Sequence, residues 1–486
     1  MPIVRSLLLS LLWVCLNGGP ALATSPSDDA SQPKQPAPNI VLIVADDWGW
    51  GDLGCHGHPY VRTPHLDALA ASGLDFHRFT VASGVCSPSR AAILTGQFPA
   101  RLNINGHFAQ VESNARRNMP DWLAVETPTL PRYLRAAGYR TGHFGKWHLA
   151  NNMIPDSPRP EAYGYDVADA FNCSGVQLPV HDDVREAVTF LKATHAEGKP
   201  FFINLWMHEP HTPFHTVPKY RWPFRTLPDD DRYDKRDEIY ASVLAHADAR
   251  IGELMTTLDE LELIDDTLVI FTSDNGPARA ASSIAATADG LALMHDTATG
   301  AGYNVAASRG LTGQRPGYKA SLYQGGVCVP FIVSWPGHVP SGAVDTTTPL
   351  SAVDLLPTLC ELAGVTLPNT EPLDGVSQVD AFKGNATPQR SRPLFWHMET
   401  RARRSARPHH WTRWAVQFEN HVLLTNDDGS TAELYNTLDD PLQQHDLATS
   451  QPDVVRTLQQ QLDSWRSTLP ASPTGDVFSG LRTQSQ

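Results

Sequence analysis

The stretch NIVLIVADD, residues 39–47, decides the fold of this 486-residue chain. Its apolar part, Ile40 to Ala45, is a continuous run rich in β-branched residues, which is typical of a strand buried on both faces of a parallel sheet. Similar runs occur at 200–207, 267–276 and 329–335. Between the runs lie helical patterns, at 63–72, 129–137, 184–193 and 237–261. Strands that alternate with helices predict a doubly wound α/β sandwich.

The pattern changes after about residue 366, where short strands separated by turns replace the buried runs. Three segments have this character, at 392–398, 412–425 and 432–436, and a helical pattern follows at 451–469. We therefore expect a larger α/β domain over residues 38–365 and a smaller α+β subdomain with an antiparallel sheet and a terminal helix over residues 366–475.

One irregular stretch, from residue 278 to about 315, is rich in Ala, Gly, Ser and Thr and exceeds ordinary loop length. Such a stretch predicts either a mobile lid over a site or a disordered insertion. His295 and Asp296 within it are candidate substrate contacts, with a solvated loop as the alternative.

The N-terminus has the pattern of a secretory signal peptide. Arg5 precedes an apolar run, and Ala21-Leu22-Ala23 is a small-x-small cleavage site. Such a segment, residues 1–23, is too short to span a membrane. Residues 24–37 are polar and proline-rich and predict a flexible linker. We therefore expect an exported protein, periplasmic or secreted, with no membrane span.

The net charge and the cysteines indicate which partners are disfavoured and whether disulfides can form. The formal net charge of −14 disfavours nucleic acid and anionic membranes as partners. Once the signal peptide has been removed, five cysteines remain, and their spacing does not resemble a zinc site. In an oxidising compartment some of these can pair while Cys86 stays unpaired, but buried free thiols are the alternative. The candidates for pairing are Cys55, Cys173, Cys328 and Cys360.

Oxygen-bearing side chains follow two of the expected strands. Asp46 and Asp47 come directly after the first strand, and Asp274 and Asn275 follow the strand that begins at 267. Ligands bind beyond the carboxyl ends of the strands in such sheets. Each pair could instead cap a helix or form a turn. Together they predict a site for a hard divalent cation such as calcium.

Basic and imidazole side chains recur after other strands. The sequence GKWHLA contains Lys146 and His148, which would face the same side of a strand. HEPHTP contains His208 and His211, and Lys319 precedes a Gly-Gly pair in KASLYQGG. A single histidine is more often structural than functional. Near a divalent cation, however, the set predicts an anion-binding site with acids and bases built in.

The segment CSPSRAAILTG, residues 86–96, resembles the C-x-P-S-R…L-T-G signature of type I sulfatases, in the alkaline-phosphatase-like superfamily. The resemblance continues in the family's order through NIVLIVADDWGWGDLGCHG, GKWHLA, HEPHTP, TSDNG and KASLYQGG. It implies a large mixed sheet between helices with a smaller C-terminal subdomain. It also implies an enzyme that hydrolyses sulfate monoesters, with bacterial arylsulfatases and N-acetylgalactosamine-6-sulfatases among the similar proteins.

The resemblance also assigns roles to residues. Cys86 would be oxidised by a maturation enzyme, which reads Pro88 and Arg90, to Cα-formylglycine, whose hydrate is the nucleophile that forms a covalent sulfoenzyme. One Ca²⁺ would be bound by residue 86 together with Asp46, Asp47, Asp274 and Asn275. Arg90 would hold the nucleophile and stabilise its charge. His148 would act on the second hydroxyl of the hydrate. Lys146, His211 and Lys319 would hold the sulfate ester, and His211 or Lys319 would protonate the leaving alcohol.

The expected substrate is a sulfated carbohydrate. One alternative is a phosphate or phosphonate monoester hydrolase of the same superfamily. It is disfavoured because the whole C-x-P-S-R…L-T-G signature is present without a second cluster of metal ligands. Another alternative is a non-catalytic carbohydrate-binding protein in which Cys86 remains a thiol.

Overall fold

The structure is a computed structural model that describes most of the chain after residue 36. The described residues are 37–151, 153–171, 183–212, 214–227, 233–278, 296–297, 300–303, 308–369, 373–399, 412–429 and 431–484. The predicted signal peptide, nearly all of the predicted linker, Cys173 and His295 lie outside them. Within the described part, no helix is both long and apolar enough to cross a membrane.

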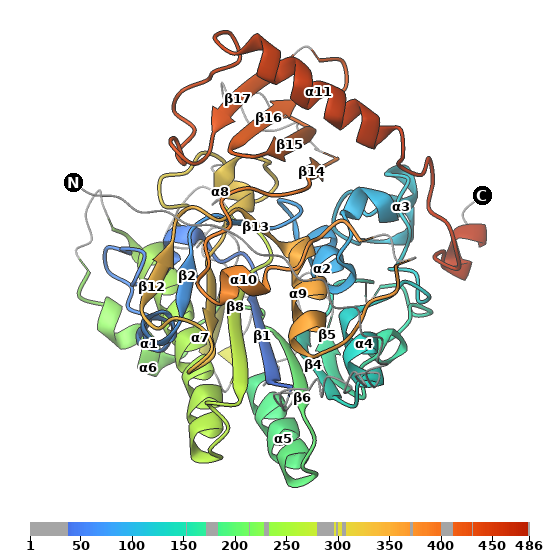
Figure 1. Cartoon of the computed structure of the whole chain (residues 1–486). Helices are drawn as coiled ribbons and strands as arrows, with labels where there is room; N and C mark the ends of the chain where they lie inside the picture. Colours follow the sequence, from blue (N-terminus) through green and yellow to red (C-terminus); the bar gives the residue numbers. More distant parts are fainter. Residues whose placement is uncertain are drawn as a thin grey trace, which may run out of the picture. The chain divides into compact units, whose positions relative to one another are not determined.

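An eight-stranded mixed sheet forms the centre of the fold (Figure 1). β1 pairs in parallel with β6 and β8, whereas β11 runs antiparallel to β8 and β2. In spatial order the strands are β12 (Ala343–Asp345), β2 (Leu74–Phe76), β11 (Phe331–Ser334), β8 (Thr267–Ser273), β1 (Asn39–Ala45), β6 (Phe201–Trp206), β4 (Arg140–Lys146) and β5 (Val167–Phe171). The predicted α/β fold is confirmed, and the four apolar runs correspond to β1, β6, β8 and β11.

The apolar residues of β1 explain why it lies in the middle of the sheet. Residues 40–45 are fully buried, and their side chains alternate between two hydrophobic cores. Ile40 and its alternate neighbours join the core that contains residues of α2 (Cys86–Thr95), α4 (Leu130–Ala136) and α9 (Leu355–Leu362). Val41 and its alternate neighbours join the core that contains residues of α1 (Pro64–Ser72), α5 (Asp183–Ala196) and α7 (Lys235–Glu260). Helices therefore cover both faces of the sheet.

A four-stranded antiparallel sheet and one helix form the C-terminal part, drawn in orange to red in Figure 1. The strands are, in order, β14 (Leu394–His397), β15 (Trp414–Phe418), β16 (His421–Thr425) and β17 (Ala432–Asn436). Helix α11 (Pro452–Arg466) buries Leu458, Leu462 and Trp465, which recur at helical spacing on one face. The Trp465 ring stacks on Phe395 with centroids 4.5 Å apart. The predicted small antiparallel sheet with a terminal helix is confirmed.

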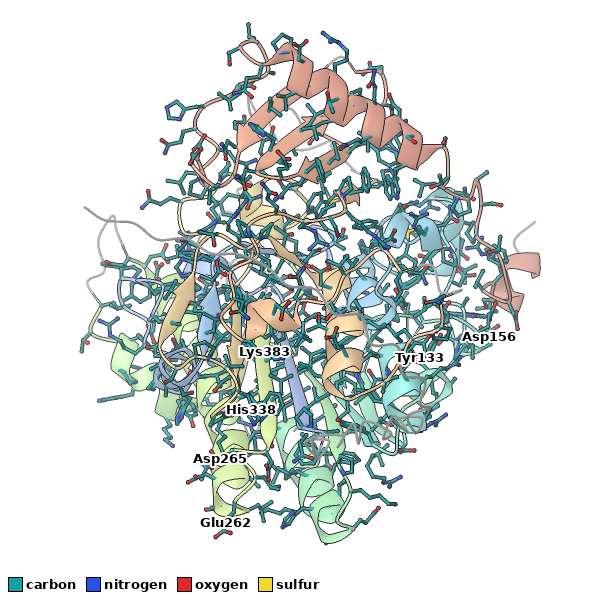
Figure 2. All side chains as sticks on the ribbon, in the orientation of Figure 1. Tyr133, Asp156, Glu262, Asp265, His338 and Lys383 are labelled. Atoms are coloured by element: carbon teal, nitrogen blue, oxygen red, sulfur yellow. The ribbon has the colours of Figure 1, made fainter. Side chains whose placement is uncertain are left out.

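Shorter elements connect these parts. The short strands are β3 (Phe79–Thr80), β7 (Phe214–His215), β9 (Asp296–Thr297), β10 (Gly300–Tyr303) and β13 (Leu350–Ser351). The short helices are α3 (Val111–Arg116), α6 (Pro218–Arg221), α8 (Gln324–Val327) and α10 (Val379–Phe382). The C-terminal segment is tied to the large domain where Ser479 Oγ donates to Asp156 Oδ1 at 2.7 Å; Figure 2 labels Asp156 beside that segment.

The structure bears on two expectations, the irregular segment 278–315 and the state of the cysteines. The stretch 278–315 was expected to be irregular, but its described part contains β9 and β10, and β10 pairs with β7. Asp296 belongs to β9. Among the described cysteines, Cys55, Cys86, Cys328 and Cys360 are free thiols; the buried-thiol alternative holds for Cys328 and Cys360, whereas Cys55 is free but exposed.

Candidate active site

The carboxyl ends of β1 and β8 bring the predicted oxygen ligands together. The two strands pair in register up to Ala45 and Ser273, so Asp46 and Asp274 follow them side by side. The Asp47 amide donates to Asp274 Oδ1 at 3.2 Å, and Asp47 has a left-handed φ of 69°. Both aspartates of the first strand, together with Asp274 and Asn275, are at most 3% exposed. The sheet therefore buries four oxygen-bearing side chains at one edge.

Cys86 and Arg90 reach this edge from α2. They lie four residues apart, which places both side chains on one face of the helix. Cys86 Sγ lies 3.7 Å from Asp46 Oδ1. Arg90 donates to Asp274 Oδ2 from Nε at 2.9 Å and from Nη2 at 2.7 Å, and its Nη1 donates to the Lys146 carbonyl at 2.8 Å. This forked contact fixes the guanidinium beside the carboxylates.

Each of the three buried carboxylates contacts at least one cation, and Arg90 also lies 3.7 Å from Asp46. Lys146 contacts Asp46, Lys319 Nζ lies 2.6 Å from Asp47 Oδ1, and Arg90 binds Asp274. The loop after β8 holds Lys319 in place, because the Lys319 amide donates to the Pro277 carbonyl at 3.0 Å. With these pairs balanced, a bound divalent cation would leave the site with a net positive charge, which suits an anionic substrate.

The predicted histidines differ in how they enter the site. β4 ends at Lys146, and His148 has a left-handed φ of 51°, so the expectation that both face one side of a strand is wrong. His148 Nε2 lies 3.1 Å from the Phe108 carbonyl oxygen, which accepts only, so Nδ1 carries the free electron pair. His211 Nδ1 lies 2.7 Å from the Thr212 carbonyl, and its Nε2 lies 3.9 Å from Asp47 Oδ2.

Burial and neighbouring charges set the protonation of these groups. Burial lowers the pKa of His148 and of His211 well below the ordinary value, so both imidazoles are neutral near pH 7. Burial alone would raise the pKa of Asp46, but Lys146 and the other cations hold it well below its usual range. Burial and the neighbouring Asp46 raise the pKa of Asp274 to about 6. The crowded carboxylates thus favour a cation among them.

The donor set fits calcium. Asp46, Asp47, Cys86 and His211 offer ligand atoms that all lie within 4.8 Å of one another. Asn275 Nδ2 donates to Asp47 Oδ1 at 2.7 Å, while its Oδ1 is buried and has no hydrogen-bond partner among the described residues. An unpaired buried amide oxygen beside carboxylates is a ligand that calcium takes readily. His211, expected to hold the substrate, also lies within this cluster.

Sequence reasoning missed several groups that shape the site. The Trp206 ring at the end of β6 lies 4.9 Å from the Arg90 guanidinium carbon, and Ser273 Oγ accepts from the Trp48 amide at 2.9 Å. The Phe108 carbonyl that orients His148 belongs to a loop with no motif. The signal for Trp206 is its position at a strand end next to HEPHTP, whereas a backbone carbonyl leaves no trace in a sequence.

Comparison with known proteins identifies the family. The sulfatase family model matches residues 38–365, which is more than half of the chain. The chain belongs to the sulfatase family. A second model, described as the C-terminal part of N-sulphoglucosamine sulphohydrolase, matches residues 318–468. The predicted family and the predicted enzyme class, a sulfuric ester hydrolase, are both confirmed.

Individual relatives agree with this assignment. Human arylsulfatase A is 31% identical over 405 residues, which cover 74% of this sulfatase and 70% of the relative. Human N-acetylgalactosamine-6-sulfatase is 30% identical over 435 residues, which cover 80% and 74%. The solved structure of Ps i-CgsB in complex with k-i-k-neocarrahexaose has a TM-score of 0.74 at 24% identity, and covers 92% of this chain and 96% of that chain. The last similarity bears on the fold alone.

Proposed function

We propose that this sulfatase is exported, binds one Ca²⁺ and removes sulfate from a carbohydrate ester by means of Cys86 converted to Cα-formylglycine. The observation that carries the proposal is the position of Cys86. Its Sγ is buried at the start of α2, beside Asp46 and on the same helix face as Arg90. Burial raises the pKa of the Cys86 thiol well above its ordinary value, so an unmodified cysteine would be a poor nucleophile here.

The charged residues account for binding of a sulfate monoester. Calcium at Asp46, Asp47, Asp274 and Asn275 would supply the charge that makes a hydroxyl at residue 86 acidic near neutral pH. Arg90 holds the side chain at position 86 and stabilises negative charge there. Lys146 and Lys319 lie next to the cluster with their ammonium groups inward, so both can bind the sulfate oxygens.

The neutral histidines account for proton movement. His148 Nδ1 can take a proton from a hydroxyl at residue 86, because its Nε2 is held by the Phe108 carbonyl. His211 and Lys319 both lie close to Asp47, and together they are candidates to protonate the leaving alcohol. Conversion of Cys86 replaces its sulfur by oxygen and requires an external oxidant together with the maturation enzyme.

Mass spectrometry of the peptide containing residue 86, from protein made in its native host, tests the modification. We expect loss of the sulfur atom and gain of an aldehyde oxygen. Cys86→Ala should abolish turnover of a sulfate ester, with weakened calcium binding still measurable by calorimetry. An unmodified thiol in fully active protein, or turnover by the alanine variant, would reject the proposed nucleophile.

A matched substrate series tests the substrate class. The similarity to an N-acetylgalactosamine-6-sulfatase supports a sulfated sugar. Sulfate and phosphate esters of the same alcohol, compared by kcat/KM, should favour sulfate. Sulfated oligosaccharides assayed for released sulfate should then be turned over faster than a simple aryl sulfate. Preference for phosphate would favour the phosphomonoesterase alternative, and binding of glycans without release of sulfate would favour the non-catalytic one.

Export and the domain boundary remain parts of the proposal. The N-terminal pattern supports cleavage after Ala23, which N-terminal sequencing of protein recovered from the periplasm or the medium would test. Full-length protein retained in the cytoplasm would reject export. The boundary at residues 365 and 366 rests on the change in sequence pattern.

A further inference from the structure

A second cluster of metal-ligating side chains lies outside the proposed calcium site. Cys55, His56 and Asp75 offer a sulfur, a nitrogen and an oxygen atom, all within 4.8 Å of one another. Cys55 is exposed, and the cluster shares no residue with the catalytic set. We propose that these residues, with His77, form a separate site for a divalent transition metal of the zinc type.

The arrangement of His56 is that of a metal-binding imidazole. Its Nδ1 lies 2.6 Å from the Trp50 carbonyl oxygen, which only accepts, so this nitrogen donates and leaves Nε2 as the ligand atom, which lies 2.8 Å from Asp75 Oδ2. A backbone carbonyl that holds the second ring nitrogen in this way is the usual support of a histidine ligand. The Trp50 ring also stacks on His56 with centroids 4.1 Å apart. Nε2 is therefore aimed at Asp75 Oδ2, and a bound metal ion would take the place of the proton that the two side chains share.

Asp75 supplies the centre of the cluster. Its Oδ2 lies 2.8 Å from His56 Nε2 and 3.4 Å from His77 Nε2. Two ligand atoms of a tetrahedral zinc ion lie about 3.3 Å apart. The distance from Asp75 to His77 already matches this value, and the distance from Asp75 to His56 must lengthen by roughly half an ångström. Asp75 is 4% exposed, and its Oδ1 is buried with no hydrogen-bond partner among the described residues.

The charge around Cys55 favours a cation. The Cys55 amide donates to Asp67 Oδ1 at 2.8 Å, so two carboxylates lie near the thiol. The negative potential of these carboxylates attracts a divalent ion. Sulfur and imidazole ligands select zinc over calcium.

Cobalt titration of chelator-treated protein tests the site. The Cys86→Ala background removes the other thiol that, in the described part of the chain, belongs to a cluster of metal-ligating side chains. We expect a thiolate-to-cobalt charge-transfer band in the near ultraviolet that saturates at one equivalent and is displaced by Zn²⁺. Cys55→Ser should remove the band and lower the Zn²⁺ affinity at least about tenfold, since even a lost ligand support costs that much. His77→Ala should weaken binding, and His65→Ala, an exposed histidine of α1, should not.

Two results would overturn the proposal. One is a Cys86→Ala protein that shows no band, and the other is a band that Cys55→Ser leaves unchanged. Because Cys55 is exposed, its serine variant should keep the wild-type circular dichroism spectrum, so loss of the band reports lost ligation and not unfolding. Unchanged Zn²⁺ affinity in His77→Ala would remove His77 from the ligand set.

Discussion

The carboxyl edge of the large sheet and the four-stranded C-terminal sheet bury different kinds of residue. At the edge of β1 and β8 the buried side chains include Asp46, Arg90 and Lys146, none with any exposed surface. In the four described strands of the C-terminal sheet the buried positions are mostly apolar, as at Leu423, Leu424 and Leu434, and none is charged. In the first region, burial of charged side chains costs free energy because the charges lose their hydration. In the second region, apolar side chains pack together and exclude water.

This difference predicts that substitutions in the two regions affect stability and activity separately. Buried ion pairs add little net stability compared with apolar packing of the same volume, so charge is retained in such places for function. Apolar packing supplies stability in proportion to the surface removed from water. Substitutions at the edge should therefore lower turnover, and substitutions in the C-terminal sheet should lower the free energy of unfolding.

The largest expected effect belongs to Arg90→Lys. Lysine keeps the charge but loses the forked contact to Asp274 and the hydrogen bond to the Lys146 carbonyl. We expect kcat for a sulfate ester to fall by about 10²–10³, as for loss of one preorganised donor. The thermal midpoint of unfolding should stay close to that of the wild type, because the buried positive charge is kept.

One control separates catalysis from maturation in that variant. Arg90 belongs to the motif that the maturation enzyme is expected to read, so lost activity could reflect an unmodified Cys86. Kinetics should therefore be normalised to the modified fraction, measured by mass spectrometry. Full activity per modified molecule would contradict the assigned role of Arg90.

The next effect tests the apolar region. Leu423→Ala removes a fully buried side chain from β16 and should lower the free energy of unfolding by about 2–5 kcal/mol. Activity per folded molecule should stay close to wild type. Urea unfolding and steady-state kinetics measure the two quantities. His421→Ala, partly exposed on the same strand, is the matched control and should cost far less.

The two regions also differ in how far the sequence predicts them. Continuous apolar runs give β1, β6 and β8, because a strand buried on both faces needs apolar residues throughout. β5 is not predicted and β4 is predicted only around Lys146, because their sequences, VADAF and RTGHFGK, mix glycine or polar residues with apolar ones. The strand-end motifs predict that Asp46 and Asp274 share a site, and the resemblance to type I sulfatases adds Cys86 to it. The Phe108 carbonyl and the left-handed turn at His148 depend on backbone geometry, which residue types do not encode.

A smaller effect concerns the pH dependence of stability, which we expect from the buried carboxyl group of Asp52 in the large domain. Burial raises the pKa of Asp52 to about 7, although the amides of Gly49 and Leu311 donate to it at 2.8 and 2.7 Å. A raised pKa in the folded state gives stability that is complete below the unfolded pKa near 4 and is lost as pH rises toward 7. Relative to Asp52→Asn, wild type should lose up to about 1.4 kcal/mol per pH unit over this range. The free energies of unfolding of the two proteins are measured in urea at pH 5 and at pH 7. The same difference between them at both pH values would contradict the prediction.

The smallest effect tests whether the two regions unfold together. Tyr323, just before α8, donates its hydroxyl to both Glu433 carboxylate oxygens on β17, at 2.8 and 2.9 Å. Tyr323→Phe should cost about 1 kcal/mol, because Glu433 keeps its bond from Tyr435 at 2.8 Å. A double-mutant cycle with Glu433→Gln, followed by urea unfolding, isolates this contact from the packing around it. If the C-terminal sheet unfolds as one unit with the catalytic domain, Tyr323→Phe shifts a single transition detected equally by tryptophan fluorescence and by loss of activity. A transition split between the two probes would show that the apolar region loses its structure while the charged edge still turns over substrate.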